Sequence, residues 1–531
     1  MKALNWWKTA VGLMIAWISA SACAEYTKDP DWRDKLPRPI YDEAPELIDL
    51  YYKAWEVTHG NIDFQPGLPV ERYMDDGHAS TRIWPWDTIL LVAACKYCPE
   101  EFPGVESLEL YYKIMVDGFW PLPKVKGNSF CGRDCGKMLP FFIQHPDMSP
   151  LYSWAEYEHA LQTGDRKRLE KVYLEKRWLQ RIYERFETFD RRAPRPAYSG
   201  MPITATKTAD GYHWGGFQSA DNTPRGRRGR HAPGSWETCP NDPDLLWVDA
   251  IAMQGLNALS TARIAALLGR SDEAKAWQMK YEAFKRKVNE LYWDEQDGFY
   301  YDIFASDRSK CKVMTIASYW PMMAGMPTPE MARRMEAHFR DPNTFGGEVP
   351  TPTLARNDPD FHSKGGYWRG SIWMLTTHPA IKAINAYGNY ELAREVAQKV
   401  LMHMAKTYHE HTPHEIWECY SPTERLPGTM TPSLRSRPSL GFATVGPITL
   451  LIEDVIGVKR ANAFENTLTC SFARQPKGRV GVRNYRFGKV TCSIVATVDE
   501  IRVESNGPFT LVADGRHLQV GTGKTIFTRK N

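Results

Sequence analysis

The sequence predicts an all-α domain of the (α/α)6 barrel (toroid) class, followed by a small C-terminal antiparallel β domain. From about residue 43 to residue 457, apolar residues recur at positions i, i+3, i+4 and i+7, which is typical of amphipathic helices. Loops rich in Gly and Pro separate about twelve such segments. After residue 459 the pattern changes to short β-rich runs separated by turns. We therefore expect twelve helices and then a sheet domain.

The expected helices are of two kinds. Residues 243–269 are apolar on more than one side, whereas residues 167–190 and 271–295 carry Lys, Arg and Glu on one face. Six inner helices inside six outer ones would produce this alternation. A superhelical repeat array would also produce it, but the lack of a fixed sequence period disfavours an array. The expected helices lie near residues 43–61, 85–98, 107–120, 150–165, 167–190, 243–269, 271–295, 311–325, 328–341, 367–388, 389–412 and 439–457.

Residues 461–531 are expected to form a β-sandwich-like domain. The dipeptides Asn506-Gly507 and Asp514-Gly515 both predict hairpin turns between short strands. Packing against the helical domain is the role we expect for it.

Composition restricts the functional classes. The chain has 531 residues, with 67 Lys and Arg against 63 Asp and Glu, so its net charge of +4 is small for its length. Such a charge gives no general field for attracting nucleic acid. The 19 Trp, 25 Tyr and 21 Phe could stack on sugar rings, although most should pack in the core.

The N-terminal residues have the layout of a secretory signal peptide, expected to span residues 1–22 ahead of a helical domain at 23–460. Lys2 and Lys8 precede an apolar run at residues 9–18, and small residues precede Cys23. Cys23 could carry a lipid anchor, which would make the protein a bacterial periplasmic or outer-membrane-tethered lipoprotein; an ordinary signal-peptidase cut is the competing interpretation. No later run reaches the roughly 18 apolar residues that would span a bilayer.

Ten cysteines are compatible with disulfides in an exported protein. Cys470 and Cys492 could bridge two strands of the β domain. The pairs Cys95/Cys98 and Cys131/Cys135 have a spacing that could hold zinc, but no compact ribbon or finger surrounds them, so we expect no metal site.

Two acidic residues have unusual surroundings. Asp221 lies in a Gly- and aromatic-rich loop that also holds Trp214, and Glu418 lies between aromatic residues just after a helix. Loops on rigid scaffolds are where sites are assembled, and a carboxyl pair can serve as general acid and general base in glycoside hydrolysis. Glu415 is a local rival to Glu418 that composition does not exclude.

Two further clusters combine flat rings with charges that can bond to sugar hydroxyls. The first is Trp86-Asp87 at a helix start. Helices capped in the ordinary way, with buried Trp, would look the same. The second cluster comprises Tyr367, Trp368, Arg369 and Trp373.

In this order, the motifs around Trp86, Asp221 to Arg225, Tyr367 to Trp373, and Glu418 to Pro422 resemble those of glycoside hydrolase family 63. Its relatives are the mannosylglycerate-hydrolase-like enzymes and the family 37 trehalases. The resemblance implies an (α/α)6 barrel and inverting hydrolysis of α-linked gluco- or manno-configured oligosaccharides, with no cofactor.

The same resemblance implies residue roles. Asp221 would be the general acid and Glu418 the general base, while the substrate would be bound by Trp86, Asp87, Trp214, Arg225, Tyr367, Trp368, Arg369 and Trp373. The chain departs from the family pattern before the acid, where residues 216–220 replace a run resembling Glu-Ser-Gly, and in the base loop at Ser421 and Glu424. Neither departure removes a catalytic carboxyl.

A basic run follows the acid. Arg227, Arg228 and Arg230 could form a solvated loop, the usual state of such runs, or could bind a carboxylate or sulfate on the glycan. Two other functions stay open: a polysaccharide lyase on a similar helical toroid, in which the basic loop would neutralise a uronate, and a glycan-binding protein without catalysis.

Overall fold

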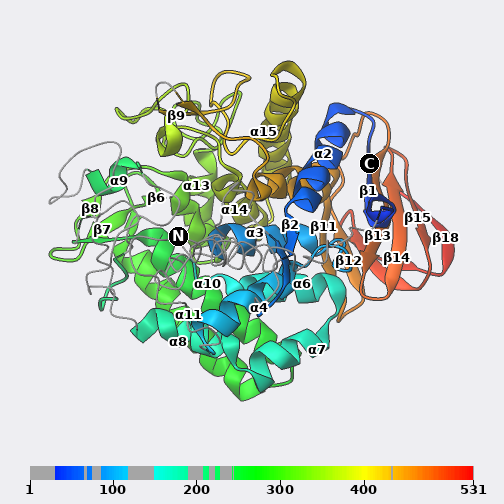
Figure 1. Cartoon of the computed structure of the whole chain (residues 1–531), viewed down its shortest axis with the longest axis horizontal. Helices are drawn as coiled ribbons and strands as arrows, with labels where there is room; N and C mark the ends of the chain where they lie inside the picture. The colour runs from blue at the N-terminus through cyan, green and yellow to red at the C-terminus, as the bar shows by residue number, and fades with distance from the viewer. Residues whose placement is uncertain are drawn as a thin grey trace, which may run out of the picture.

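The computed structural model describes residues 30–64, 69–74, 85–117, 149–188, 207–213, 222–227, 242, 244–431 and 434–529. Predictions that concern Cys23, Cys131, Cys135, Trp214 and Asp221 lie outside these residues. The described chain consists of a mainly helical part and a β-rich C-terminal part (Figure 1).

Two sets of helices alternate along the chain. The members of the first set are buried almost all round: α3 (Pro85–Cys95), α6 (Tyr152–Thr163), α10 (Val248–Leu267), α12 (Trp320–Met323), α14 (Met374–Ala386) and η7 (Gly446–Ile456). The second set is α2 (Glu46–Gly60), α4 (Gly104–Met115), α8 (Trp178–Thr188), α11 (Ser271–Leu291), α13 (Pro329–Ala337) and α15 (Tyr390–Glu410). In α11 only Trp277, Tyr281 and Val288 are buried, as the charged pattern of an outer helix predicts.

The first set of helices makes successive contacts. Helix α6 packs against α3 and α10, α10 against α12, α12 against α14, and η7 against both α14 and α3. Shorter turns complete the helical part: η1 (Trp32–Lys35), α7 (Arg166–Leu169), η3 (Glu170–Glu175), α9 (Pro224–Arg227), η4 (Ile316–Tyr319), η5 (Tyr367–Arg369) and η6 (Gly441–Thr444).

Besides the segment 311–325, which becomes helical only at Ile316, two expected helices differ from the structure. The segment 167–190 is not continuous, because it widens into η3 and Arg177 then adopts a positive φ of 52° before α8 begins. The segment 367–388 becomes regular helix only at Met374, because Gly370 has a φ of 152° and Ile372 pairs with another loop. At both places tertiary contacts therefore determine the backbone conformation, although the spacing of apolar residues favours a continuous helix.

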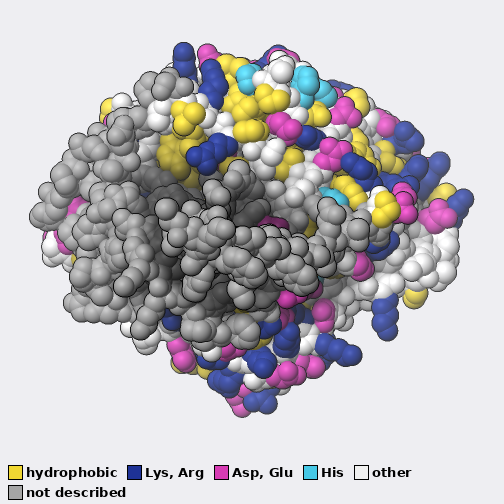
Figure 2. Space-filling view, in the orientation of Figure 1, with side chains coloured by type: hydrophobic (Ala, Val, Ile, Leu, Met, Phe, Trp, Pro, Cys, Tyr) yellow, Lys and Arg dark blue, Asp and Glu magenta, His cyan; other side chains and the backbone are white. Residues whose placement is uncertain are grey.

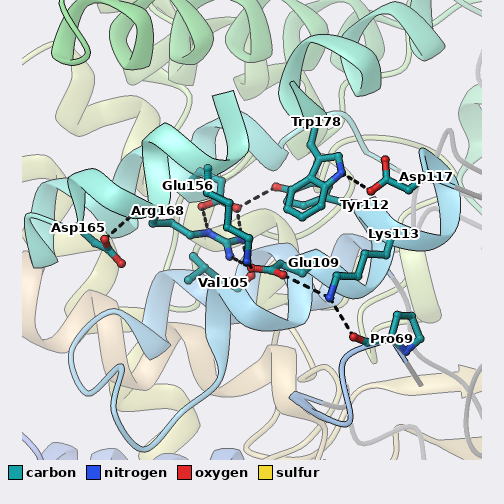
Figure 3. A network of polar contacts seen from close by, with 11 residues as sticks. Pro69, Val105, Glu109, Tyr112, Lys113, Asp117, Glu156, Asp165, Arg168 and Trp178 are labelled. Carbon is teal, nitrogen blue, oxygen red and sulfur yellow. Dashed lines mark hydrogen bonds and ion pairs between the residues drawn. The ribbon is translucent and has the colours of Figure 1, made fainter. Parts of the chain in front are cut away.

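A buried charge network joins α4, α6 and α7 (Figure 3). Arg168 donates to both carboxylate oxygens of Glu156, at 2.9 and 2.6 Å, to Glu109, and to the Val105 carbonyl at 2.9 Å. Tyr112 donates to the same Glu156 at 3.0 Å. Because every charge has a partner, burial of this network is compatible with a stable fold.

The C-terminal part contains two sheets, with strand orders β1-β13-β14-β15-β18 and β11-β12-β16-β17. Their strands are β1 (Arg38–Tyr41), β11 (Val458–Asn462), β12 (Thr467–Cys470), β13 (Val480–Phe487), β14 (Val490–Ala496), β15 (Glu500–Ser505), β16 (Phe509–Ala513), β17 (Arg516–Val520) and β18 (Gly523–Thr528). Strand β1 comes from the N-terminal region and pairs antiparallel with β13, a contact that the sequence did not indicate.

Short strands also occur within the helical part. They form the pairs β2 (Ile62–Phe64) with β3 (Arg72–Met74), β5 (Trp293–Asp294) with β6 (Phe299–Tyr300), and β9 (Thr429–Thr431) with β10 (Leu434–Arg435), and a three-stranded sheet of β4 (Leu245–Leu246), β7 (Asp302–Phe304) and β8 (Lys310–Cys311).

The two turn predictions of the β domain have different outcomes. The hairpin at Asp514-Gly515 is confirmed, since it joins β16 to β17 and both residues have positive φ. The hairpin at Asn506-Gly507 is wrong, because β15 and β16 belong to different sheets and the chain crosses between them.

The described cysteines are buried free thiols. The bridge expected between Cys470 and Cys492 is therefore wrong in this structure; the two residues lie on β12 and β14, in different sheets. Cys95 and Cys98 are also free, and burial raises the pKa of both thiols. Within the described residues, no three or more His, Cys, Asp or Glu side chains form a group that could hold a metal ion.

Charges of both signs are interspersed on the face shown in Figure 2. This distribution agrees with the small net charge of the chain. None of the described helices is long and apolar enough to cross a membrane.

Candidate active site

Helix α3 begins with two of the predicted site residues. Pro85 starts the helix and Asp87 lies in its first turn, where proline and an acidic residue are both favoured. The Trp86 side chain is 2% exposed and contacts Trp320 edge to face, with ring centroids 5.6 Å apart. Residue Asp87 is also buried. The aromatic contact fixes the helix start against α12.

Glu418 lies in a loop held by pairing on both sides of it. Its backbone N–H donates to the Arg437 carbonyl at 2.8 Å, and Tyr420 forms an antiparallel bridge with Ile372. The Arg437 N–H lies 3.4 Å from Glu418 Oε2. Glu418 is 3% exposed. The loop therefore places a carboxylate in the protein interior.

Asp87 and Glu418 interact electrostatically, although 331 residues of the sequence separate them. Burial raises the pKa of Asp87 to about 8, and the negative charge of Glu418 adds to the shift. Two neighbouring carboxyls whose environments separate their protonation states are typical of sites for acid and base chemistry. The raised pKa favours the protonated form of Asp87, which can donate a hydrogen bond.

The rival carboxylate Glu415 is occupied elsewhere. Its Oε1 accepts from Lys53 Nζ at 3.1 Å, and its Oε2 accepts from Ser439 Oγ at 3.0 Å. The Lys53–Glu415 pair is partly exposed, at 18% and 25% of the two side chains. This geometry assigns Glu415 to a contact between α2 and the base loop.

Asn222, which follows Asp221 in the chain, is buried and bonded through both ends of its amide. Its Nδ2 donates to the Gly366 carbonyl at 3.0 Å, and its Oδ1 accepts from the Trp368 N–H at 2.8 Å. The described chain that begins after Asp221 is thus attached to the cluster at residues 366–373.

Arg225 lies in a buried ion-pair triad with Asp249 and Asp302. Its guanidinium donates twice to Asp302, both at 2.6 Å, and twice to Asp249, at 3.1 and 2.8 Å. It also stacks 4.2 Å from the centroid of the Trp247 ring. Because two carboxylates and a ring occupy most of this guanidinium, its main task in the structure is to hold the segment after Asp221 in place.

The predicted cluster at Tyr367 to Trp373 forms a compact aromatic group. Trp368 stacks on Trp373 with ring centroids 4.2 Å apart, and Trp373 stacks on Phe442 at 6.0 Å. Tyr367 contacts both Trp368 and Trp373 edge to face. Arg369 forms an ion pair with Asp360 at 2.8 Å.

One small cavity brings together residues from several of these segments. Its walls include Trp86, Arg225 and Trp368, and its volume of about 20 Å³ has room for about one water or hydroxyl group. Thr223 in the Asp221 to Arg225 motif also lines the cavity. The remaining lining residues come from helix interiors and loops without an unusual sequence pattern: Asp249, Met253, Thr315, Ile316, Ala317, Trp320, Thr353 and Thr376.

Three polar atoms of cavity-lining residues have no hydrogen-bond partner in the described structure. They are Trp86 Nε1, Trp368 Nε1 and Thr315 Oγ1, and all three are buried. Leaving a buried donor unsatisfied costs free energy, so a hydroxyl-bearing ligand that bonds to them would recover part of that cost.

The basic run after Asp221 is described only in part. Arg227 ends α9, but the structure does not describe its side chain, and Arg228 and Arg230 lie outside the described residues. The binding of an anionic substituent there stays a prediction.

Comparison with known families locates most of these residues, although not Trp86 and Asp87, within a recognised domain. The family model described as the mannosylglycerate hydrolase MGH1-like glycoside hydrolase domain matches residues 147–428. The matched segment contains Asp221, Arg225, Trp368 and Glu418.

Curated relatives agree with this match. An uncharacterized protein of Borreliella burgdorferi is 24% identical over 444 residues, which cover 80% of this chain and 82% of that protein. The mannosyl-oligosaccharide glucosidase of Saccharomyces cerevisiae is 25% identical over 156 residues, 28% of this chain and 19% of that protein. The cytosolic neutral trehalase of Kluyveromyces lactis is 25% identical over 134 residues, 25% of this chain and 18% of that enzyme.

Solved structures extend the likeness to the fold. The GH63 mannosylglycerate hydrolase from Thermus thermophilus, in complex with Tris and D-glycerate, superposes with a TM-score of 0.52 and 16% identity. The alignment covers 75% of this chain and 99% of that one. A sialidase superposes with a TM-score of 0.63 and 15% identity, over 94% of this chain and 40% of that one.

Proposed function

Because this chain belongs to the mannosylglycerate hydrolase MGH1-like glycoside hydrolases, we propose that it hydrolyses α-linked gluco- or manno-configured oligosaccharides with inversion at the anomeric carbon. The observation that carries the proposal is the buried Glu418 carboxylate, which interacts with the buried Asp87 at the start of α3, while the rings of Trp86 and Trp368 line one cavity. Glycosidases need such a carboxylate, and stacked rings suit the apolar faces of a sugar.

The proposed mechanism divides the work between two carboxyls. Glu418 removes a proton from water as the water attacks the anomeric carbon, and Asp221 gives its proton to the departing glycosidic oxygen. The bond from the anomeric carbon to that oxygen breaks as the bond to water forms. This chemistry requires no metal or cofactor.

Asp87 and the aromatic residues would hold the sugar. Protonated Asp87 can donate a hydrogen bond to a sugar hydroxyl without adding a second negative charge beside Glu418. Trp86 Nε1, Trp368 Nε1 and Thr315 Oγ1 can bond to further hydroxyls or to a retained water. The proposed binding set also includes Trp214, Tyr367, Arg369 and Trp373. Arg225 stabilises the site through its hydrogen bonds to Asp302 and Asp249.

The proposed architecture is an (α/α)6 barrel. The successive contacts among α3, α6, α10, α12, α14 and η7, with six further helices alternating along the chain, support this architecture. Trp86 and Asp87 at the start of α3 and residues 366–372 before α14 would then lie at the same end of the inner helices.

Export is a separate proposal that rests on the N-terminal sequence. Residues 1–22 would be removed, and Cys23 would become a lipidated N-terminus or lie close to an ordinary cleavage site. Mass spectrometry of the N-terminal peptide, with Cys23→Ser beside the wild type, distinguishes the two. An intact N-terminus at Met1 would contradict export by this route.

The first experiment is time-resolved proton NMR with a panel of α-linked gluco-, manno- and acidic oligosaccharides. Initial release of the β anomer, lost in Asp221→Asn and in Glu418→Gln, is the expected result. Initial release of the α anomer, or activity that survives both substitutions, would contradict the mechanism. An unsaturated uronide product would identify a lyase, and binding without cleavage would identify a glycan-binding protein.

A further inference from the structure

Residues 366–372, called the strap below, contact the two segments that carry the proposed catalytic carboxyls. Those segments, 221–225 and 416–422, are almost 200 residues apart in the sequence. The strap has hydrogen bonds to the first at one end and to the second at the other. It therefore connects the two segments through hydrogen bonds.

At its first end the strap is bonded to the Asn222 side chain. The Gly366 carbonyl accepts from Asn222 Nδ2 at 3.0 Å, and the Trp368 N–H donates to Asn222 Oδ1 at 2.8 Å. Asn222 is 3% exposed, so water does not compete for these bonds. Two bonds in opposite directions fix the amide plane relative to the strap.

At its second end the strap pairs with the base loop. The Ile372 N–H donates to the Tyr420 carbonyl at 2.9 Å, and the Tyr420 N–H donates to the Ile372 carbonyl at 3.0 Å. Tyr420 lies two residues after Glu418, and its hydroxyl accepts from the Trp417 N–H at 3.0 Å. The strap therefore bonds directly to Tyr420, and the Tyr420 side chain in turn contacts Trp417, the residue before Glu418.

The strap itself has little freedom. Gly366 and Tyr367 have positive φ of 58° and 62°, and Gly370 has a φ of 152°. A Cβ on Gly370 would lie 2.7 Å from the His362 carbonyl oxygen. The Gly366 N–H donates to Thr429 Oγ1 at 2.9 Å. Because the backbone of the strap is restricted to these conformations, a displacement of one end would also displace the other end.

We propose that Asn222 is a positioning residue that holds the acid segment at a fixed distance from the base loop through the strap. The inference rests on the proposed function, because inversion requires the two carboxyls to stay roughly 6.5–9.5 Å apart. Asn222 itself touches no reacting atom in this proposal. Its contribution is to the placement of the residue before it in the chain.

The test compares two substrates of the same sugar that differ in their need for an acid. An α-glycosyl fluoride loses fluoride with little help from a proton donor, whereas an alkyl α-glycoside needs the acid fully. In Asn222→Ala we expect kcat on the alkyl glycoside to fall by about 100-fold, the effect of a small misplacement, with less than about 5-fold loss on the fluoride.

Two further variants make the result specific. Asn257→Ala removes another fully buried amide, on α10, and should leave the ratio of the two rates unchanged. Thr429→Val keeps the side-chain shape but removes the acceptor for Gly366, so it should shift the ratio in the same direction as Asn222→Ala and by less. If Asn222→Ala does not fold, Thr429→Val alone carries the test.

Equal losses on both substrates, or no loss, in Asn222→Ala and Thr429→Val would overturn the positioning role while the proposed function stands. A wild-type protein that cleaves neither substrate would overturn the proposed function, and this inference with it.

Discussion

Asp87 at the start of α3 interacts electrostatically with Glu418, and both of these carboxyl side chains are buried. Burial is the larger cause of the raised pKa of Asp87, about 8, and the charge on Glu418 is the smaller. The same relationship makes the stability of the protein depend on pH in a defined direction.

The native state holds the Asp87 proton more tightly than the unfolded chain does, because the ordinary pKa of an Asp side chain is 3.8. The stability from this group is complete below that value and is lost as pH rises toward about 8, by up to about 1.4 kcal/mol per pH unit. Asp87→Asn should remove this dependence. Urea unfolding of both proteins between about pH 5 and pH 8 measures it, and parallel curves for wild type and variant would contradict the assignment.

Glu415 and Glu418 provide a matched pair of substitutions in one loop. Glu418→Gln should lower kcat by about 10²–10⁴-fold, the usual contribution of a general base. Glu415→Gln should keep kcat within about 3-fold and lower the free energy of unfolding by about 0–1 kcal/mol, because its partner Lys53 stays partly solvated. Steady-state kinetics and urea unfolding distinguish the two, and a reversed order of the kcat losses would make Glu415 the base.

Arg225 should be required for stability as well as for the site. Arg225→Leu leaves Asp249 and Asp302 buried without their cation, and we expect a loss of about 3–5 kcal/mol in the free energy of unfolding. Arg479→Leu is the control, since Arg479 makes two similar bonds to Asp42 but is 56% exposed. It should cost much less than Arg225→Leu, because solvent screens this exposed pair. Similar losses in both variants would show that burial does not set the cost.

The helical pattern of the sequence predicted most helices, because an inner helix such as α10 and an outer helix such as α11 differ in how much of their surface is apolar. The pattern could not predict where tertiary contacts interrupt it. Gly370 and Ile372 lie in a stretch of helical period, yet their backbone serves the strap. The pairing of β1 with β13 could not be predicted either, because a four-residue strand is too short to show an alternating pattern of apolar residues.

For the site, motif order predicted Glu418 and the aromatic clusters, but not the carboxylates that support Arg225. Asp249 and Asp302 lie in an ordinary helix turn and a short strand, and only their distance from Arg225 distinguishes them from surface acids. Thr315 was missed for the same reason, since a lone Thr before a helix is usually a cap. Proximity between distant segments is not encoded in local composition.

Glu453 on η7 should make the fold sensitive to acid, in the opposite sense to Asp87. Lys96 contacts its Oε1 at 2.9 Å, Tyr97 donates to the same oxygen at 2.5 Å, and Lys382 bonds to Oε2. Burial alone would raise the pKa of Glu453, but the two ammonium groups hold it well below its ordinary value of 4.5. The stability from this group is therefore present above about pH 4.5 and is lost as pH falls through the lowered value.

Glu453→Gln should lower the free energy of unfolding by about 3–5 kcal/mol near neutral pH, because two buried cations lose their shared partner. The difference from wild type should stay constant from about pH 7 to pH 5 and shrink at lower pH, where the wild-type carboxylate takes up its proton. Glu395→Gln, whose side chain is 51% exposed and pairs with Lys399, is the control and should change little at any pH. If the difference in unfolding free energy between wild type and Glu453→Gln does not shrink in acid, the charge on Glu453 is not what makes the native state sensitive to acid. The acid sensitivity would then have to arise from Asp454, which Lys382 and Lys459 contact.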